Sequence, residues 1–448
     1  MADTPPDPAN NTPASRFTNL YPTLTAHLAL VESQRCLYCS DAPCLAACPT
    51  DIDVPAFIAA IAQDNIQGAA RTIYQENILG GSCARVCPTE ILCEQACVRN
   101  AESQPIQIAR LQRYALDHAP VEPHPFERAA ATGRRVAVVG AGPAGLSCAH
   151  QLSVLGNEVD IFEAEHKPGG LNEFGVARYK LSDDYAQKEI AFLLSLGGIQ
   201  MHYGQALGKN IHLVQLLQQF DAVFLATGLG LSRQLGLANE TVQGISNAID
   251  AIKQIRQSRD LSDLTVPRRC IILGGGNTAV DIAVQIKLLG AESAVIVYRR
   301  GIESMSATTH ELALAKQHQV QILNWAQPVK IMLDQRGQVC GMQFEKTNMI
   351  QNRLVGTGTL FELPADAIFK ATGQLLNPAI DTEFPAGSLR IEQGRIWVDA
   401  CFQTSVARLY AGGDCIARDP DLTVYAVQHG KLAARAMHRA MQLEPAHG

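Results

Sequence analysis

One stretch of the sequence restricts the fold more than any other, because it joins an apolar run to a glycine-rich turn and a second apolar run. Val136 to Val139 are typical of a short buried parallel strand, and the sequence Gly140-Ala141-Gly142-Pro143-Ala144-Gly145 follows directly. In this G-x-G-x-x-G pattern Gly140 permits a tight turn, Gly142 lets the backbone approach a pyrophosphate, and Gly145 lets the next helix pack against the strand. The helix start also offers free N–H groups to phosphates. The stretch therefore predicts a dinucleotide-binding unit.

A second strand and an acidic residue follow at the distance that this unit requires. The strand runs from Val159 to Phe162, and Glu163 stands at its end, where a carboxylate can bind a ribose hydroxyl. The run Lys167 to Leu171 (KPGGL) then predicts a turn that would bring backbone close to the cofactor. The alternative is a glycine-rich turn that binds nothing.

A second fingerprint lies further along the chain. Cys270 to Leu273 form an apolar strand, and Gly274 to Ala279 (GGGNTA) have the pattern G-x-G-x-x-A. The next strand, Ala294 to Tyr298, ends in Arg299-Arg300 instead of an acid. Arginine at this place can pair with a 2′-phosphate, which favours NADP over NAD, and a solvated basic pair is the alternative.

Strands that end in small residues surround the second fingerprint. Ala222 to Gly228 (AVFLATG) and Ala367 to Gly373 (AIFKATG) suit two chain crossings between nested domains. Near the C-terminus the strand Leu409 to Ala411 ends in Gly412-Gly413-Asp414, and a helix follows from about Thr423. Asp414 can accept a hydrogen bond from a cofactor hydroxyl or can simply cap the turn. Strands and helices alternate throughout this part, so the fold class is α/β.

Eight of the 13 cysteines are clustered near the start of the chain. They form the groups Cys36-x2-Cys39-x4-Cys44-x3-Cys48-Pro49 and Cys83-x3-Cys87-Pro88-x4-Cys93-x3-Cys97. Each group resembles the bacterial ferredoxin run C-x2-C-x2-C-x3-C-P with altered spacing, and two [4Fe–4S] clusters need eight ligands. Zinc favours paired C-x2-C units, and only Cys36 and Cys39 have that spacing. Core thiols without metal are the remaining alternative.

The domain organisation follows from these motifs. Residues 1–20 predict a disordered tail, and a cluster of prolines from Pro120 to Pro125 marks a linker that ends near Gly133. We expect a helical iron–sulfur domain over 21–125, followed by two nested Rossmann-like domains. The first would cover 134–240 and 374–448, and the second would cover 241–373.

Charge and hydropathy exclude several classes of partner. The net charge of −6 gives no electrostatic reason to expect nucleic acid. No apolar run approaches the ~20 residues that span a bilayer. The first residues lack the basic start and apolar core of a signal peptide, so we expect a cytoplasmic protein without a membrane partner.

The order of the motifs resembles that of a known superfamily, which includes the glutamate synthase small subunit and the N-terminal half of dihydropyrimidine dehydrogenase. Ala42 to Pro55, Gly169 to Gly175 and Val297 to Gly301 carry the resemblance, which covers roughly residues 30–440. The chain is most similar to the flavin-binding small subunits of bacterial NAD-dependent dihydropyrimidine dehydrogenases. This resemblance implies FAD in the first Rossmann-like domain and NADH or NADPH in the second.

The resemblance also implies the ligands of each group. The residues that would bind FAD are Gly140, Gly142, Pro143, Ala144, Gly145, Glu163, Gly170, Leu171, Gly413, Asp414 and Thr423. Lys180 would join them, because it stands where the family often has an arginine on the flavin side. The residues that would bind NAD(P)H are Gly275, Gly276, Asn277, Thr278, Arg299, Arg300, Ala371, Thr372 and Gly373. The mammalian-type enzyme has a further basic residue for the 2′-phosphate, and this chain has Ser306 at about that place. This difference weakens the prediction of NADP. The NAD preference of the close relatives also disagrees with the arginine pair, which favours NADP.

For the two clusters, the family pattern implies ligands from both cysteine groups. One cluster would take Cys36, Cys39, Cys44 and Cys97, and the other would take Cys48, Cys87, Cys93 and Gln112. The cysteine count alone would use Cys83 in place of the glutamine. A neutral glutamine ligand would change the charge and hence the potential of its cluster.

By this resemblance, the chain oxidises NAD(P)H through FAD and passes electrons through the two clusters. Hydride transfer to a flavin needs alignment, so we expect no catalytic acid or base here. The chain contains nothing like an FMN-binding β/α barrel, so a partner subunit with FMN and iron–sulfur clusters would reduce uracil or thymine, in a hetero-oligomer. The alternatives are a glutamate synthase small subunit, a ferredoxin:NAD(P)H oxidoreductase, and a zinc-stabilised nucleotide-binding module. A thioredoxin-reductase-like activity is disfavoured, because no C-x-x-C follows the first fingerprint.

Overall fold

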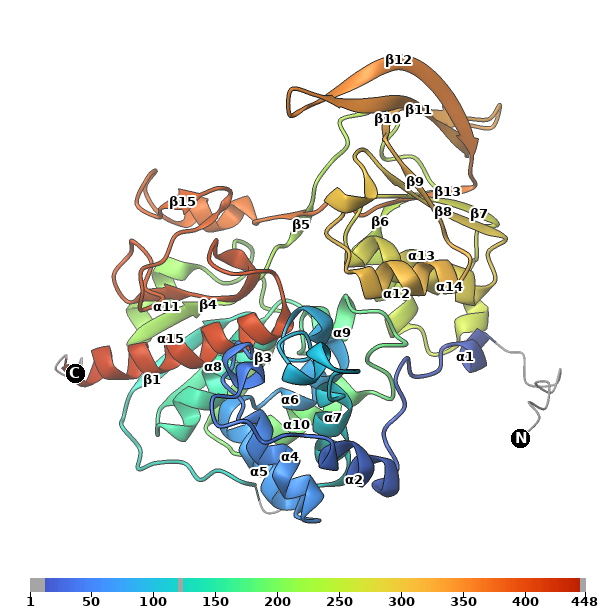
Figure 1. The fold of residues 1–448 in the computed structure, drawn as a ribbon. Coiled ribbons are helices and arrows are strands. Elements are labelled where there is room, and N and C mark those ends of the chain that lie inside the picture. Colours follow the sequence, from blue (N-terminus) through green and yellow to red (C-terminus); the bar gives the residue numbers. More distant parts are fainter. Residues whose placement is uncertain (1–12, 120–123, 444–448) are drawn as a thin grey trace. The chain divides into compact units, whose positions relative to one another are not determined.

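The computed structural model describes residues 13–119 and 124–443, with side chains from residue 15 onward, and it divides them into two compact units (Figure 1). The inserted unit contains Leu231–Leu375, the short segment Phe174–Ser182 and the described residues up to Leu20. The main unit contains the rest of the described chain, from Tyr21 onward. The iron–sulfur region and the first fingerprint therefore share one unit.

A parallel sheet of five strands forms the centre of the main unit. Its order is β17 (Leu409–Ala411), β4 (Ala222–Leu225), β1 (Arg135–Val139), β2 (Glu158–Glu163) and β3 (Ile199–Tyr203). The four predicted apolar residues of β1 are all buried, as expected for a central parallel strand. The helices are α8 (Pro143–Val154), α9 (Leu171–Phe174, whose last residue belongs to the inserted unit), α10 (Tyr185–Leu194), α11 (Leu213–Gln219) and α15 (Thr423–Leu443).

The N-terminal part of the main unit is helical, as predicted. Its helices are α2 (Ala26–Gln34), α3 (Pro43–Ala46), α4 (Val54–Ala62), α5 (Ile66–Glu76), α6 (Gly80–Val86) and α7 (Ile108–His118). Side chains before two of them explain where they start, because the Asp53 carboxylate accepts a hydrogen bond from the Ala56 N–H and Asn65 accepts one from Gly68. The core of this region packs Phe57, Ile58 and Leu111 at zero exposure.

The inserted unit has a second parallel sheet built in the same way. Its order is β6 (Ile245–Asn247), β13 (Ala367–Lys370), β7 (Arg269–Leu273), β8 (Ser293–Tyr298) and β9 (Gln321–Asn324). The helices are α1 (Pro13–Arg16), α12 (Ala248–Gln257), α13 (Asn277–Leu289) and α14 (Thr309–Gln317). An antiparallel sheet of β10 (Ala326–Leu333), β11 (Val339–Ile350) and β12 (Arg353–Pro364) follows, and it was not among the expected elements.

The expected boundaries differ from the observed ones in three places. The chain crosses between the units at Gly230 and Leu231, ten residues before the expected 240. It crosses back at Leu375 and Leu376, two residues after the expected 373. Phe174–Ser182 also belongs to the inserted unit, where the Arg178 guanidinium donates to the Ile255 carbonyl of α12 and the Arg178 N–H donates to the Gln285 side chain of α13.

The expected tail needs a correction. Residues 1–12 lie outside the described residues, but Pro13–Arg16 form α1, Phe17 is only 7% exposed, and the Leu20 N–H donates to the Tyr179 carbonyl at 2.9 Å. Burial of the Phe17 ring in an apolar core supplies the free energy that orders this part of the chain. Within the described ranges, no helix has the length and apolarity needed to span a bilayer.

Candidate dinucleotide and iron–sulfur sites

The first fingerprint turn tolerates only glycine at two positions. Gly140 has φ +104°, and a methyl group on it would lie 2.4 Å from the Ala226 carbonyl oxygen. A methyl group on Gly145 would lie 1.9 Å from the Gly140 carbonyl oxygen. A methyl group on Gly142, in contrast, would meet only the Gly170 Cα, at 3.8 Å. The fold itself therefore requires Gly140 and Gly145, and the space in front of Gly142 is left open for a ligand.

The acidic residue and the Gly-Gly turn both contact this fingerprint. The Glu163 carboxylate accepts hydrogen bonds from the Ala141 N–H at 2.7 Å and the Glu165 N–H at 2.8 Å. The Gly169 N–H donates to the Ala141 carbonyl at 2.7 Å, and Gly170 has φ +52° next to Gly142. Because a carboxylate has about four acceptor positions, Glu163 can still bind a ribose hydroxyl.

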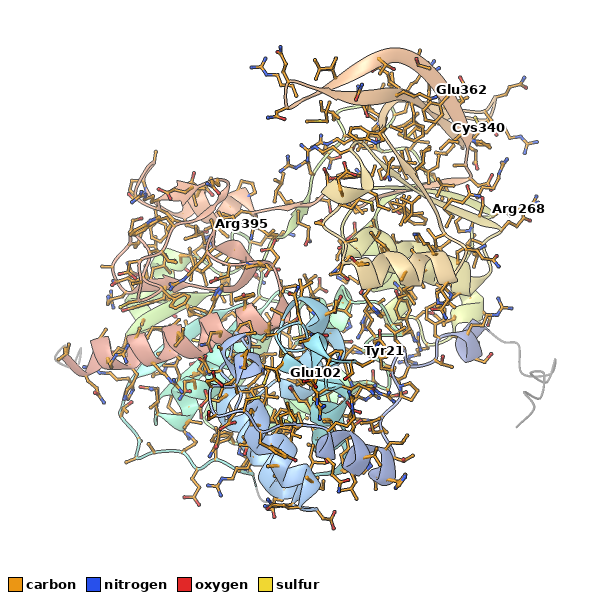
Figure 2. The ribbon with its side chains drawn as sticks, viewed as in Figure 1. Tyr21, Glu102, Arg268, Cys340, Glu362 and Arg395 are labelled. Carbon is orange, nitrogen blue, oxygen red and sulfur yellow. The ribbon has the colours of Figure 1, made fainter. Side chains whose placement is uncertain are left out.

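The C-terminal motif approaches the fingerprint from another side. Gly413 has φ +76°, and a methyl group on it would lie 3.0 Å from the Ala144 Cβ. Arg395, labelled in Figure 2, donates to the Asp414 carbonyl at 2.7 Å and holds this turn. Thr423 is the first residue of α15, and its Oγ1 donates to the side-chain oxygen of Asn172 at 3.0 Å. Asn172 directly follows Leu171. Except for Lys180, the segments that were expected to bind FAD thus meet at one end of the sheet.

Asp414 is held in an environment that disfavours its charge. Burial, reinforced by the nearby Asp421 carboxylate, raises the pKa of Asp414 to about 6. A hydroxyl or N–H donor from a ligand would stabilise the ionised form of this carboxylate. The position is therefore suited to a hydrogen bond with a cofactor.

The second fingerprint repeats the geometry of the first within the inserted unit. Gly274 has φ +150°, and a methyl group on it would lie 2.2 Å from the Ala371 carbonyl oxygen. Helix α13 begins at Asn277, whose side chain accepts from the Thr308 N–H at 3.2 Å. Ser306 lies beside Gly276, since its Oγ would be 3.1 Å from a methyl group there. In both sheets the turn Ala-Thr-Gly therefore lies against the first glycine of a fingerprint.

The arginine pair and Lys180 have different surroundings. Arg299 and Arg300 are exposed at the end of β8. Lys180 lies in the inserted unit, where its ammonium contacts Asp281 at 2.7 Å and Glu311 at 2.6 Å. Burial lowers the pKa of Lys180, but these two carboxylates more than offset that effect and hold it above its usual value. The structure therefore places Lys180 in an ion cluster of the inserted unit, and its expected contact with FAD stays a prediction.

Two cavities in the helical region collect the clustered cysteines. The cysteines that line the first cavity are Cys36, Cys39, Cys44 and Cys97. The candidate ligands that line the second cavity are Cys48, Cys83, Cys87, Cys93 and Gln112. Apolar side chains such as Ile58 and Ile108 complete the first cavity, and Leu92 and Val424 help to line the second.

The donor sets fit clusters better than single ions. Across the part of the chain that the structure describes, no three His, Cys, Asp or Glu side chains are close enough to hold one metal ion. Thiols spread around an apolar cavity suit a larger iron–sulfur group, because thiolates are its preferred ligands. Burial and the neighbouring Cys36 raise the pKa of the Cys44 thiol to about 11, so a bound metal would be needed to hold it as a thiolate.

Gln112 and Cys83 compete for the last position at the second cavity. The Gln112 side-chain nitrogen donates to the Gly80 carbonyl at 2.6 Å, which directs the amide nitrogen to that carbonyl and leaves the amide oxygen as a possible ligand. Cys83 is only 3% exposed. Its side chain is hydrogen-bonded to Cys87, and this bond, with burial, raises the pKa of Cys87.

Several residues around these sites escaped the sequence analysis. Gly430, Glu189 and Lys431 are buried in contacts between segments that are distant in the chain, as described below. Of these three residues, only Gly430 has a signal in the sequence, because it lies in the middle of α15. Glycine destabilises the interior of a helix, so its presence there points to a packing requirement.

Comparison with known proteins agrees with this geometry. Residues 13–123 match the family model described as dihydropyrimidine dehydrogenase domain II, 4Fe-4S cluster, and residues 134–430 match the pyridine nucleotide-disulphide oxidoreductase model. The chain is 33% identical over 424 residues to the NAD-dependent dihydropyrimidine dehydrogenase subunit PreT of Salmonella typhimurium, covering 94% of this chain and 97% of that protein. It is 31% identical over 446 residues to the glutamate synthase [NADPH] small chain of Escherichia coli, covering 93% and 92%.

The structural comparison concerns the fold alone. Thioredoxin reductase of T. acidophilum superimposes with a TM-score of 0.54 at 19% identity, covering 68% of this chain and 99% of that one. This likeness confirms the expected pair of nested Rossmann-like folds.

Proposed function

Because the chain belongs to the family of NAD-dependent dihydropyrimidine dehydrogenase subunits and related glutamate synthase small chains, we propose that it supplies electrons for pyrimidine reduction. It is an NAD(P)H-dependent flavin oxidoreductase with an iron–sulfur domain. In the proposal it oxidises NADH or NADPH and passes the electrons to a partner subunit with FMN and iron–sulfur clusters. That partner reduces uracil or thymine to the 5,6-dihydropyrimidine.

One observation carries the proposal: the proposed flavin contacts and the second cysteine cavity adjoin each other. Thr423 contacts the segment after Leu171, and the next residue, Val424, lines the cavity. Bound FAD would accept a hydride from the nicotinamide and release electrons singly to iron–sulfur clusters. The start of α8 would bind the pyrophosphate, Glu163 a ribose hydroxyl, and the cavity cysteines the iron.

A second candidate function has specific support from the glutamate synthase small chain, which covers almost the whole sequence at a similar identity. Electron input would be the same, but the partner would be the large glutamate synthase chain. The partner therefore separates the two candidates, and the residues of this chain do not.

The function is tested by anaerobic purification of the tagged chain from its native cells, with assay of the complex. We expect an FMN and iron–sulfur partner and uracil reduction driven by reduced nicotinamide. A large glutamate synthase chain without uracil turnover would overturn the pyrimidine assignment. Comparison of kcat/KM for NADH and NADPH shows whether the exposed pair Arg299-Arg300 recognises a 2′-phosphate.

A second prediction concerns the eighth cluster ligand. If Gln112 completes the second cluster, Cys83→Ser should keep the iron and acid-labile sulfide of the wild type, whereas Cys87→Ser and Gln112→Leu should each lose about half. The exposed, isolated Cys401 provides the control, since Cys401→Ser should change neither quantity. Loss of half the iron in Cys83→Ser, with full content in Gln112→Leu, would assign the position to Cys83.

A further inference from the structure

A hydrogen-bonded connection runs from the second cavity to helix α15, and the proposed function does not use it. Thr50 is fully buried, and its Oγ1 lies 3.4 Å from the Cys48 sulfur, one of the proposed ligands of the second cluster. The Asn77 side-chain nitrogen donates to the same Oγ1 at 3.5 Å. Asn77 also lines the cavity.

The chemistry of the cluster fixes the direction of the bond between Thr50 and Cys48. A cysteine that binds iron is a thiolate and has no proton to donate, so only the hydroxyl can be the donor. Asn77 uses the oxygen of this hydroxyl as an acceptor, which leaves the hydroxyl proton for the sulfur. Hydrogen bonds to cluster sulfurs favour the reduced, more negative state.

Lys431 of α15 holds Thr50 from the opposite side. Its ammonium donates to the Thr50 carbonyl at 2.9 Å, to the Glu76 carbonyl at 2.9 Å and to the Glu76 carboxylate at 2.8 Å. Lys431 is 5% exposed, so water screens its charge only weakly. The same helix begins at Thr423 and contributes Val424 to the cavity wall.

We propose that Thr50 and Lys431 set the reduction potential of the second cluster, Thr50 through its hydrogen bond to Cys48 and Lys431 through its buried charge. Both are positioning residues that make reduction of this cluster more favourable. This inference rests on the proposed function, because it requires a cluster in the second cavity. It adds that the helix that starts at the proposed flavin site also controls the electron acceptor beside it.

The hydrogen bond is tested by EPR-monitored redox titration of anaerobically purified full-length protein. Thr50→Val replaces the hydroxyl with a methyl group of the same shape and keeps the backbone carbonyl for Lys431. The equilibrium constant for reduction should fall about tenfold, which is ~59 mV for a one-electron couple. Thr50→Ser should restore the wild-type midpoint. Thr72 is the matched control, because its hydroxyl donates to the Gly68 carbonyl of its own helix, and Thr72→Val should leave both midpoints unchanged.

The charge is tested by two variants with opposite expected signs. Lys431→Met removes the buried positive charge and should lower the midpoint of the second cluster. Glu76→Gln leaves the ammonium without its carboxylate partner and should raise the midpoint. A purely structural role for the pair would move both midpoints in the same direction, and that result would overturn the proposal for Lys431.

Different results would contradict the proposed function and the proposal for Thr50 and Lys431. If iron content and EPR show no second cluster in the wild type, both are contradicted. If the cluster is present and Thr50→Val titrates like the wild type, only the inference for Thr50 falls. If Thr50→Val does not assemble the cluster, Lys431→Met and Glu76→Gln still decide whether α15 influences the potential.

Discussion

Replacement of Gly430 by alanine should weaken flavin binding and lower the free energy of unfolding by about 3 kcal/mol. This value lies in the upper part of the usual range for an overpacked core. Gly430 lies in α15 where this helix crosses α8, and the two helices run side by side in Figure 1. A methyl group on it would lie 2.1 Å from the Ala144 carbonyl oxygen and 2.8 Å from the Cys148 nitrogen. These are backbone atoms, which cannot rotate away, so α8 would have to move.

Movement of α8 matters because its first turn is the proposed pyrophosphate site. We expect Gly430→Ala to bind at least tenfold less FAD, measured as the ratio of flavin absorbance to protein, and to unfold at a lower urea concentration. Gly230 is the matched control, since a methyl group there would come no closer than 3.7 Å to the Asn377 Cβ. Normal flavin content and an unchanged urea midpoint in Gly430→Ala would contradict the prediction.

A companion variant separates the fold from the ligand. Gly142→Ala has room for its methyl group in the structure, so it should keep the stability of the flavin-free protein. It should nevertheless bind FAD poorly, because the methyl group would occupy the space that the pyrophosphate needs. Gly430→Ala should lower both quantities. Equal flavin binding in Gly142→Ala and the wild type would move the flavin site away from this turn.

The sequence predicts both fingerprint units well, because each is built from contiguous residues with a strong local pattern. β1, α8 and β2 follow one another directly, and so do β7, α13 and β8. The apolar strand, the glycine turn and the helix start are each determined by neighbours in the chain. The same local logic explains why the helical character of the cysteine-rich region could be expected.

Contacts between distant segments could not be predicted in this way. Lys180 pairs with Glu311, which is 131 residues further along the chain, and Phe17 packs in a core formed largely by the inserted unit. The cysteines show the same limit. The structure places Cys97 at the cavity of Cys36, Cys39 and Cys44, and it places Cys48 at the other cavity. In ferredoxin-like runs the fourth cysteine often binds the other cluster, but this pattern does not say which distant cysteine takes its place. The choice of Cys97 came from the family resemblance.

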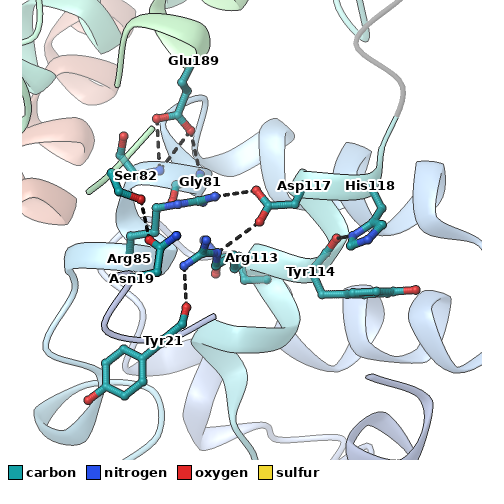
Figure 3. A network of polar contacts seen from close by, with 12 residues as sticks. Asn19, Tyr21, Gly81, Ser82, Arg85, Arg113, Tyr114, Asp117, His118 and Glu189 are labelled. Atoms are coloured by element: carbon teal, nitrogen blue, oxygen red, sulfur yellow. Dashed lines mark hydrogen bonds and ion pairs between the residues drawn. The ribbon is translucent and has the colours of Figure 1, made fainter. Parts of the chain in front are cut away.

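The second large effect concerns Glu189, a buried carboxylate of α10 that joins the two parts of the main unit. It accepts hydrogen bonds from the Gly81 N–H at 2.7 Å and the Ser82 N–H at 3.1 Å, at the start of α6 (Figure 3). Helix α6 carries Cys83 and leads directly to Cys87. Glu189 therefore attaches a wall of the second cavity to the flavin-binding part.

Burial dominates the ionisation of Glu189. It raises the pKa from 4.5 to about 7, although the Ser82 and Gly81 hydrogen bonds and the nearby Arg85 oppose this shift. Tyr74 and Tyr185 also face the carboxylate, and Asp117 faces Tyr74, Tyr185 and Arg85. Between pH 4.5 and 7 the folded protein therefore binds a proton here that the unfolded chain does not. The contribution of Glu189 to stability must fall as the pH rises through this window, by up to about 3 kcal/mol.

Glu189→Gln should remove this pH dependence while it keeps an oxygen for both N–H groups. We expect the variant to be more stable than the wild type at pH 8 and close to it at pH 5, in urea unfolding followed by circular dichroism. Glu189→Ala should be less stable at both pH values, because it leaves two buried N–H groups without an acceptor, at a cost of about 1–3 kcal/mol each.

The control for Glu189→Gln is Glu292→Gln. Glu292 is exposed, and its hydrogen bond with Arg268 lowers its pKa from the usual value, whereas the pKa of Glu189 is raised. This substitution should leave the slope between pH 5 and 8 unchanged. Parallel stability curves for the wild type and Glu189→Gln would mean that Glu189 is ionised in the folded protein throughout this range. Its bonds to α6 would then outweigh its burial, and the contact would act as an ordinary charged helix cap.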